Sequence, residues 1–143
     1  MTRTLLVATG LLAFSILMSL PAFAALPGPL PPEQTQGAIS YVSGGFGKEE
    51  VQAFEAASKP YPLSLEFAIK HAPHAEFTAD VHVMVKDAQG KSLLDTRSAG
   101  PFLLAKLPTG HYTVTAEQHG QTLTRTADVA MHKSAHLLFL WAK

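Results

Sequence analysis

The 143-residue sequence contains no cysteine. This absence excludes a disulfide framework, a thiolate nucleophile, a lipid anchor on cysteine and any zinc site with cysteine ligands. Aromatic residues are also scarce, at 8% of the chain. A domain of this composition has to hold its fold by packing alone.

Neither sign of charge is in excess, because 11 lysines and arginines balance 11 aspartates and glutamates. No basic cluster is present to neutralise phosphates, so we expect neither nucleic acid nor an anionic membrane surface as a partner. No sequence motif points to a cofactor.

The N-terminus has the three parts of a secretory signal peptide, assigned to residues 1–24. Arg3 supplies the positive charge, Leu5 to Leu20 is an apolar run, and Ala22-Phe23-Ala24 supplies the small residues of a cleavage site. Cleavage before Ala25 would leave 119 residues with a formal charge of −1, because Arg3 is the one charged residue removed. We expect a periplasmic protein with no stable membrane anchor; the alternative is an uncleaved anchor.

The rest of the chain divides into a proline-rich extended leader over residues 25–43 and a single domain over residues 44–143. One helix is predicted over about residues 48–57. Val51, Phe54 and Ala57 form an apolar stripe at helical spacing, and Pro60 follows to end the helix. Gly44-Gly45-Phe46-Gly47-Lys48 lacks the spacing and the hydroxyl residue of a phosphate-binding loop.

Beyond this helix the apolar residues alternate with polar ones, which is typical of half-buried strands. We predict seven strands separated by turns, and therefore a mainly β protein folded as an antiparallel sandwich. The strands are expected at about residues 63–69, 81–86, 92–96, 102–107, 112–116, 121–129 and 136–141.

Two segments, 80–90 and 100–116, carry a family pattern. The first segment is a strand followed by an Asp-x-x-Gly turn at Asp87 to Gly90. The second segment contains two runs, Gly100-Pro101-Phe102-Leu103-Leu104 and Leu107-Pro108-Thr109-Gly110-His111-Tyr112-Thr113-Val114. Over about residues 78–141 this order resembles the carboxypeptidase regulatory-like domain. The resemblance implies a seven-stranded prealbumin-like, or carbohydrate-binding-like, β-sandwich that is an accessory domain without catalytic residues.

Histidine is the residue type best suited to a metal site, and His71 and His74 share one short loop. Together with a third ligand they could bind copper, zinc or nickel, whereas the alternative is two ordinary loop histidines. No catalytic motif is found: a Gly-x-Ser-x-Gly elbow is absent, and no glutamate stands at the zinc-peptidase spacing from His71. We therefore expect no enzyme activity.

A hairpin is predicted around His119-Gly120, with Gln118 opposite Gln121. This register places a polar row on one face, made of Thr113, Thr115, Glu117, Thr122, Thr124 and Thr126. The row is either a docking face or an ordinary solvated strand face.

The last predicted strand is apolar on both sides, with Phe139 and Trp141 on one face and Leu138 and Leu140 on the other. Such a strand is usually central in a sheet.

Three functions remain open. The first is a non-catalytic periplasmic binding module whose partner is an envelope protein or a glycan. The second is a metal-binding protein that uses His71 and His74, and the third is a small hydrolase. Edge strands could pair two copies, but the sequence neither requires nor forbids this.

Overall fold

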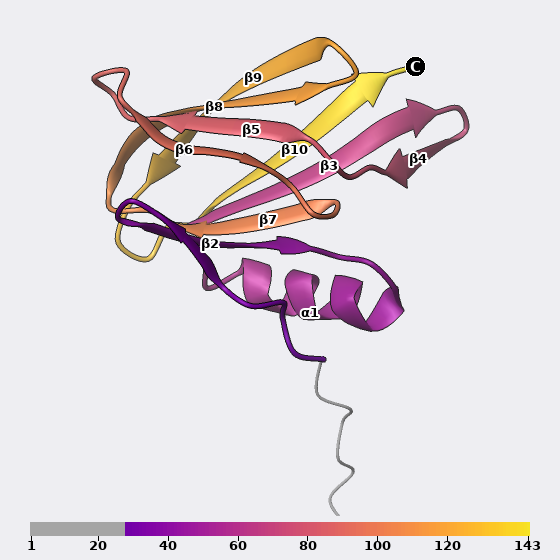
Figure 1. Ribbon diagram of the computed structural model, residues 1–143, viewed down its shortest axis with the longest axis horizontal. Coiled ribbons are helices and arrows are strands. Elements are labelled where there is room, and N and C mark those ends of the chain that lie inside the picture. The colour runs from indigo at the N-terminus through magenta and orange to yellow at the C-terminus, as the bar shows by residue number, and fades with distance from the viewer. Residues whose placement is uncertain (1–27) are drawn as a thin grey trace, which may run out of the picture.

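The computed structural model describes residues 28–143, which form two β-sheets and one helix (Figure 1). The predicted signal peptide and its cleavage site lie outside these residues. No helix in residues 28–143 is long and apolar enough to cross a membrane. The elements are β1 Gln34–Gln36, β2 Ile39–Gly44, α1 Lys48–Ser58, β3 Leu63–His71, β4 His74–Phe77, β5 His82–Lys86, β6 Ser92–Arg97, β7 Phe102–Lys106, β8 Gly110–Gln118, β9 Gln121–Val129 and β10 Ala135–Ala142.

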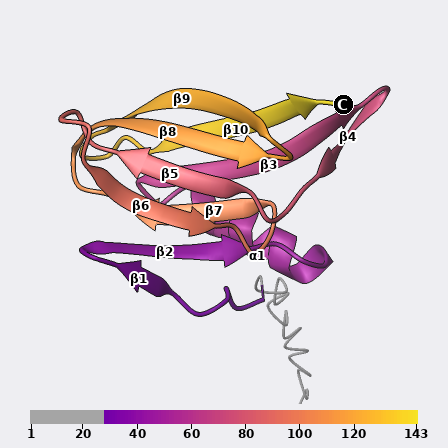
Figure 2. The same cartoon turned by 45° about the horizontal axis from the view of Figure 1, so that its top comes forward.

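Sheet A has the strand order β1-β2-β7-β3-β10, with β4 paired to β3, and sheet B has the order β6-β5-β8-β9. The sheets face each other over one core, and Figure 2 shows α1 on the side of sheet A that faces away from sheet B. Alternation along each strand explains this core, since every second residue points inward. The innermost members are fully buried: Leu63, Leu65, Phe67, Val81, Val83, Val85, Leu94, Leu103, Val114, Ala116 and Phe139.

A mainly β fold with two sheets and one short helix is confirmed, but the number of strands is not seven. All seven predicted strands are present as β3 and β5 to β10, and three more accompany them. We missed β4 because it is a short, exposed extension of a hairpin. We missed β1 and β2 because β1 has only three exposed residues and β2 is buried on both faces, which removes the alternation.

The boundary of the domain also changes. Residues 34–43 were expected to lie in the extended leader, yet they contribute β1 and nearly all of the inner strand β2 to sheet A. Val42 faces the helix while Tyr41 faces the core, so this part of the chain belongs to the sandwich.

The sandwich is not wholly antiparallel. β10 runs parallel to β3 in an unbroken register from Ala135 opposite Leu63 to Ala142 opposite Lys70. Moreover, β10 lies at the edge of sheet A, so the prediction of a central strand was wrong. Phe139 and Trp141 point into the core as expected, whereas Leu138 and Leu140 on the opposite face remain exposed.

The predicted helix is confirmed as α1. Its stripe packs on the outer face of sheet A, where fully buried Phe54 stacks on Phe102 with ring centroids 5.6 Å apart. Val42 and Leu104 complete this second, smaller core. Because α1 contacts β2 and β7, it covers that half of the face and leaves the β3, β4 and β10 half uncovered.

Candidate functional site

An exposed apolar patch lies on the uncovered half of the outer face of sheet A. We define the apolar patch as Ala68, Ala75, Phe77, Leu138 and Leu140, which line a groove of about 300 Å³ together with Glu66. Phe77 is 51% exposed, Leu138 47% and Leu140 38%. Exposed large apolar side chains that gather around one groove are typical of a binding surface.

The position of the apolar patch follows from strand alternation. β3 and β10 run side by side, so Leu138 is level with Glu66 and Leu140 with Ala68 on the same face. Phe77, from β4, pairs opposite Ala68 on the other side of β3. The Phe77 ring also packs against the Phe102 ring, with centroids 5.3 Å apart. This contact connects the apolar patch to the smaller core under α1.

Glu66, which lines the groove, belongs to a polar cluster with a serine and a histidine that lie beside it. The Ser64 hydroxyl lies 3.0 Å from His136 Nδ1, and His136 Nε2 lies 3.6 Å from Glu66 Oε2. The combination has the residue types of a hydrolase triad, but a nucleophile must reach its substrate. Ser64 is only 1% exposed, so its hydroxyl is placed to orient the imidazole rather than to attack a substrate.

His71 and His74 are brought together, because they end β3 and begin β4 and pair directly opposite each other. His71 Nε2 also lies 3.8 Å from Glu76 Oε2. Within residues 28–143, however, no three histidine, aspartate or glutamate side chains are arranged to hold a metal ion. Metal binding at this hairpin therefore stays a prediction that lacks an assembled third ligand.

The predicted register of the β8–β9 hairpin is confirmed. Thr113 pairs with Thr126, Thr115 with Thr124, and Glu117 with Thr122, around a tight turn in which His119 and Gly120 both have positive φ. This row lies on the outer face of sheet B and is exposed or half-buried. It lacks an exposed aromatic ring or an apolar groove, and its role in docking stays a prediction.

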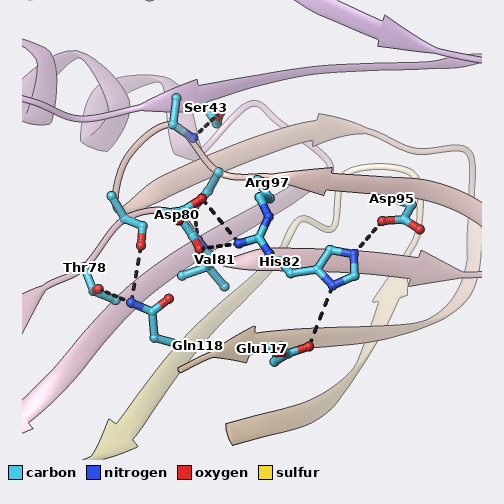
Figure 3. A network of polar contacts seen from close by, with 12 residues as sticks. Ser43, Thr78, Asp80, Val81, His82, Asp95, Arg97, Glu117 and Gln118 are labelled. Atoms are coloured by element: carbon cyan, nitrogen blue, oxygen red, sulfur yellow. Dashed lines mark hydrogen bonds and ion pairs between the residues drawn. The ribbon is translucent and has the colours of Figure 1, made fainter. Parts of the chain in front are cut away.

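A polar network that sequence reasoning missed occupies the neighbouring part of sheet B (Figure 3). His82 on β5 lies between two carboxylates, with Nε2 2.6 Å from Asp95 on β6 and Nδ1 3.9 Å from Glu117 on β8. At its end, Gln118 is buried and donates to the Thr78 hydroxyl at 2.7 Å. The contact between His82 and Glu117 could have been predicted from strand pairing alone, because the two residues lie directly opposite each other on β5 and β8. The network joins β5, β6 and β8.

Side chains close the open side of the sandwich between β9 and β10. The Trp141 indole N–H donates to the Gln121 carbonyl at 2.9 Å, and the Arg125 guanidinium lies 5.7 Å from the centroid of the Phe139 ring. Arg125 thus covers the edge of the core from the inward side of β9. Trp141 is only 3% exposed, which leaves its ring inaccessible to a sugar.

The chain matches no protein-family model and no curated protein. The assignment of function therefore depends on the site itself.

Proposed function

We propose that this chain is a non-catalytic protein-binding module of the periplasm, built on a prealbumin-like sandwich of the carboxypeptidase regulatory-like type. The signal-peptide pattern of residues 1–24 supports export. The two-sheet architecture and the Asp87–Gly90 turn between β5 and β6 are consistent with the resemblance. Neither feature identifies a partner, because sandwiches of this shape serve many functions.

The apolar patch is the observation that carries the proposal. Three large apolar side chains are about half exposed around one groove, although α1 covers the adjoining half of the same face. Exposed apolar area is costly in water unless something covers it for part of the time. A partner that buries Phe77, Leu138 and Leu140 would remove this cost.

The chemistry of the apolar patch favours a protein over a glycan. Sugar rings stack on flat aromatic faces next to hydrogen-bonding groups, whereas Leu138 and Leu140 are aliphatic. Among residues 28–143 the exposed aromatic rings are Phe46 and Phe77. An envelope protein that presents an apolar segment, with a basic residue to meet Glu66, fits the groove.

Site-directed photocrosslinking in the periplasm tests the proposal. A benzoylphenylalanine at Phe77 should form an adduct with one envelope protein, and the same probe at Thr124, on the outer face of sheet B, should not. Excess purified wild-type domain should compete for the adduct, while a Leu140→Glu domain should compete poorly. Adducts from position 124 but not from position 77 would overturn the proposal, as would adducts that both competitors reduce equally.

A further inference from the structure

The free edge of β10 differs from every other sheet edge in residues 28–143. β1 has three residues and β4 has four. β6 carries Asp95 and Arg97 next to a β-bulge, and β9 carries Arg125 and Asp128. Short length, charge and bulges are the devices that prevent edge strands from pairing with other chains.

β10 has none of these devices. Its eight residues, Ala-His-Leu-Leu-Phe-Leu-Trp-Ala, contain no lysine, arginine, acid or proline, and its register with β3 has no bulge. A long, regular, apolar edge strand is an open template for another strand. A further strand beside β10 would give its exposed residues Leu138 and Leu140 apolar cross-strand neighbours.

The hydrogen bonds of β10 identify which groups are free. The Ala135 N–H donates to the Pro62 carbonyl at 2.8 Å, on the side of β3. Because successive residues of a strand direct their N–H and C=O groups to opposite edges, Leu137, Phe139 and Trp141 also bond toward β3. The backbone groups of His136, Leu138, Leu140 and Ala142 therefore point to the free edge.

We propose that this edge pairs with the β10 of a second copy, antiparallel about a two-fold axis at Phe139. Leu138 then forms a hydrogen-bonded pair with Leu140 of the second copy, and Leu140 with its Leu138. Any such pairing has to join even-numbered residues, because these carry the free groups. Among those registers, this one places both exposed leucines of each copy opposite a leucine.

Charge supports the antiparallel order. On β3, Glu66 is level with Leu138 and Lys70 is level with Ala142, so acid and base lie toward opposite ends of β10. The antiparallel arrangement directs the Lys70 end of one copy toward the Glu66 end of the other, whereas a parallel arrangement would bring like ends together. The two β3 strands would be about 14 Å apart, so this charge preference is small and weakens with salt. A surface that is complementary to itself in this way forms a closed pair rather than a filament.

The inference deepens the proposed function and rests on it, because both use the exposed side of β10. Pairing would join the apolar patches of two copies into one continuous surface. Phe77 lies on β4, across β3 from the free edge, and would remain available to the envelope partner.

Disulfide trapping tests the register. Because the chain has no cysteine of its own, every disulfide that forms must involve the introduced residues. Tagged Leu138→Cys and untagged Leu140→Cys mature domains are mixed and oxidised with oxidised glutathione. A hydrogen-bonded antiparallel pair has Cα atoms about 5.5 Å apart, which a disulfide spans. We expect the mixed 138–140 disulfide as the main product, little 138–138 product, and none from a Thr124→Cys control.

Sedimentation measures the pairing itself. The wild-type mature domain should approach twice the monomer mass as its concentration rises, and the Leu138→Lys/Leu140→Lys variant should remain a monomer with an unchanged circular dichroism spectrum. Phe77→Ser should still dimerise. A wild-type monomer at every concentration, a dominant 138–138 product, or equal trapping at position 124 would overturn the inference. Photocrosslinking from position 77 by a monomeric wild type would leave the proposed function standing while the dimer fails.

Discussion

The side-chain amide of Gln36 pairs with the backbone of Asp95. Gln36 Oε1 accepts a hydrogen bond from the Asp95 N–H at 2.5 Å, and Gln36 Nε2 donates to the Asp95 carbonyl at 3.0 Å. β1 belongs to sheet A and β6 to sheet B, so this side chain joins the two sheets at the open side opposite to β9 and β10. It also occupies backbone groups of an edge strand that would otherwise be open to another chain.

Replacing this amide should loosen that side of the sandwich. Gln36→Ala is expected to lower the free energy of unfolding by about 1 kcal/mol, as the loss of two exposed hydrogen bonds. Urea denaturation measures the effect, with Thr35→Ala on the same strand as the matched control. Equal stability of the two variants would show that the Gln36–Asp95 contact does not hold the sheets together.

The contact between α1 and sheet A makes a second prediction. Phe54→Ala removes a fully buried ring stacked on Phe102 and should cost about 3–5 kcal/mol of the free energy of unfolding. Phe46→Ala, just before α1, removes a ring that is 65% exposed and should change stability by less than about 0.5 kcal/mol. Chemical denaturation of the two variants compares them. A small effect at Phe54 would mean that the helix does not depend on this contact.

A third prediction concerns pH. Lys106 Nζ donates to Glu33 Oε2 at 2.7 Å, and this hydrogen bond lowers the pKa of Glu33 and raises the pKa of Lys106. A lowered carboxyl pKa adds stability that is complete above the unfolded-state value of about 4.3 and is lost as the pH falls through the folded-state value. The raised pKa of Lys106 acts at the other extreme, where its stabilisation is lost as the pH rises through the folded-state value.

The variant Glu33→Gln should therefore be less stable than wild type near neutral pH and should approach it in acid. The difference is expected to shrink in high salt, because both groups are in contact with solvent. Urea denaturation across the pH range measures it, and an NMR titration of Glu33 reports its pKa directly. A stability difference that is the same at acid and neutral pH would show that ionisation of Glu33 is not responsible.

Thermal melts with added Zn²⁺, Cu²⁺ or Ni²⁺ test the histidine hairpin. We expect no shift, because His71 and His74 face each other without an assembled third ligand. An ion at about one hundred times its dissociation constant would add about 2.7 kcal/mol and raise the melting temperature by several degrees. A rise that disappears in the His71→Ala/His74→Ala variant would favour the metal-binding function instead.

Local pattern predicted much of this fold. Period-two alternation is sufficient to place β3 and β5 to β10, because each of these strands has at least one face in the core. The β8–β9 register followed from the His119-Gly120 turn, since the length of a tight turn determines which residues pair. The helix could be predicted equally well from Val51, Phe54 and Ala57, because their spacing places all three on the face that packs against the sheet.

The sequence by itself determined the strands, the helix and the hairpin register, because these depend on residues that are near one another in the chain. Only the tertiary structure decided that β2 lies inside sheet A, that β10 pairs parallel to β3, and that α1 covers one half of a sheet face. These outcomes depend on which distant segments meet, as Ala135 meets Leu63 across 72 positions. The apolar patch arises in the same way: Leu138 and Leu140 have the pattern of a buried strand, and they are exposed because α1 covers only the β2 and β7 half of the outer face of sheet A.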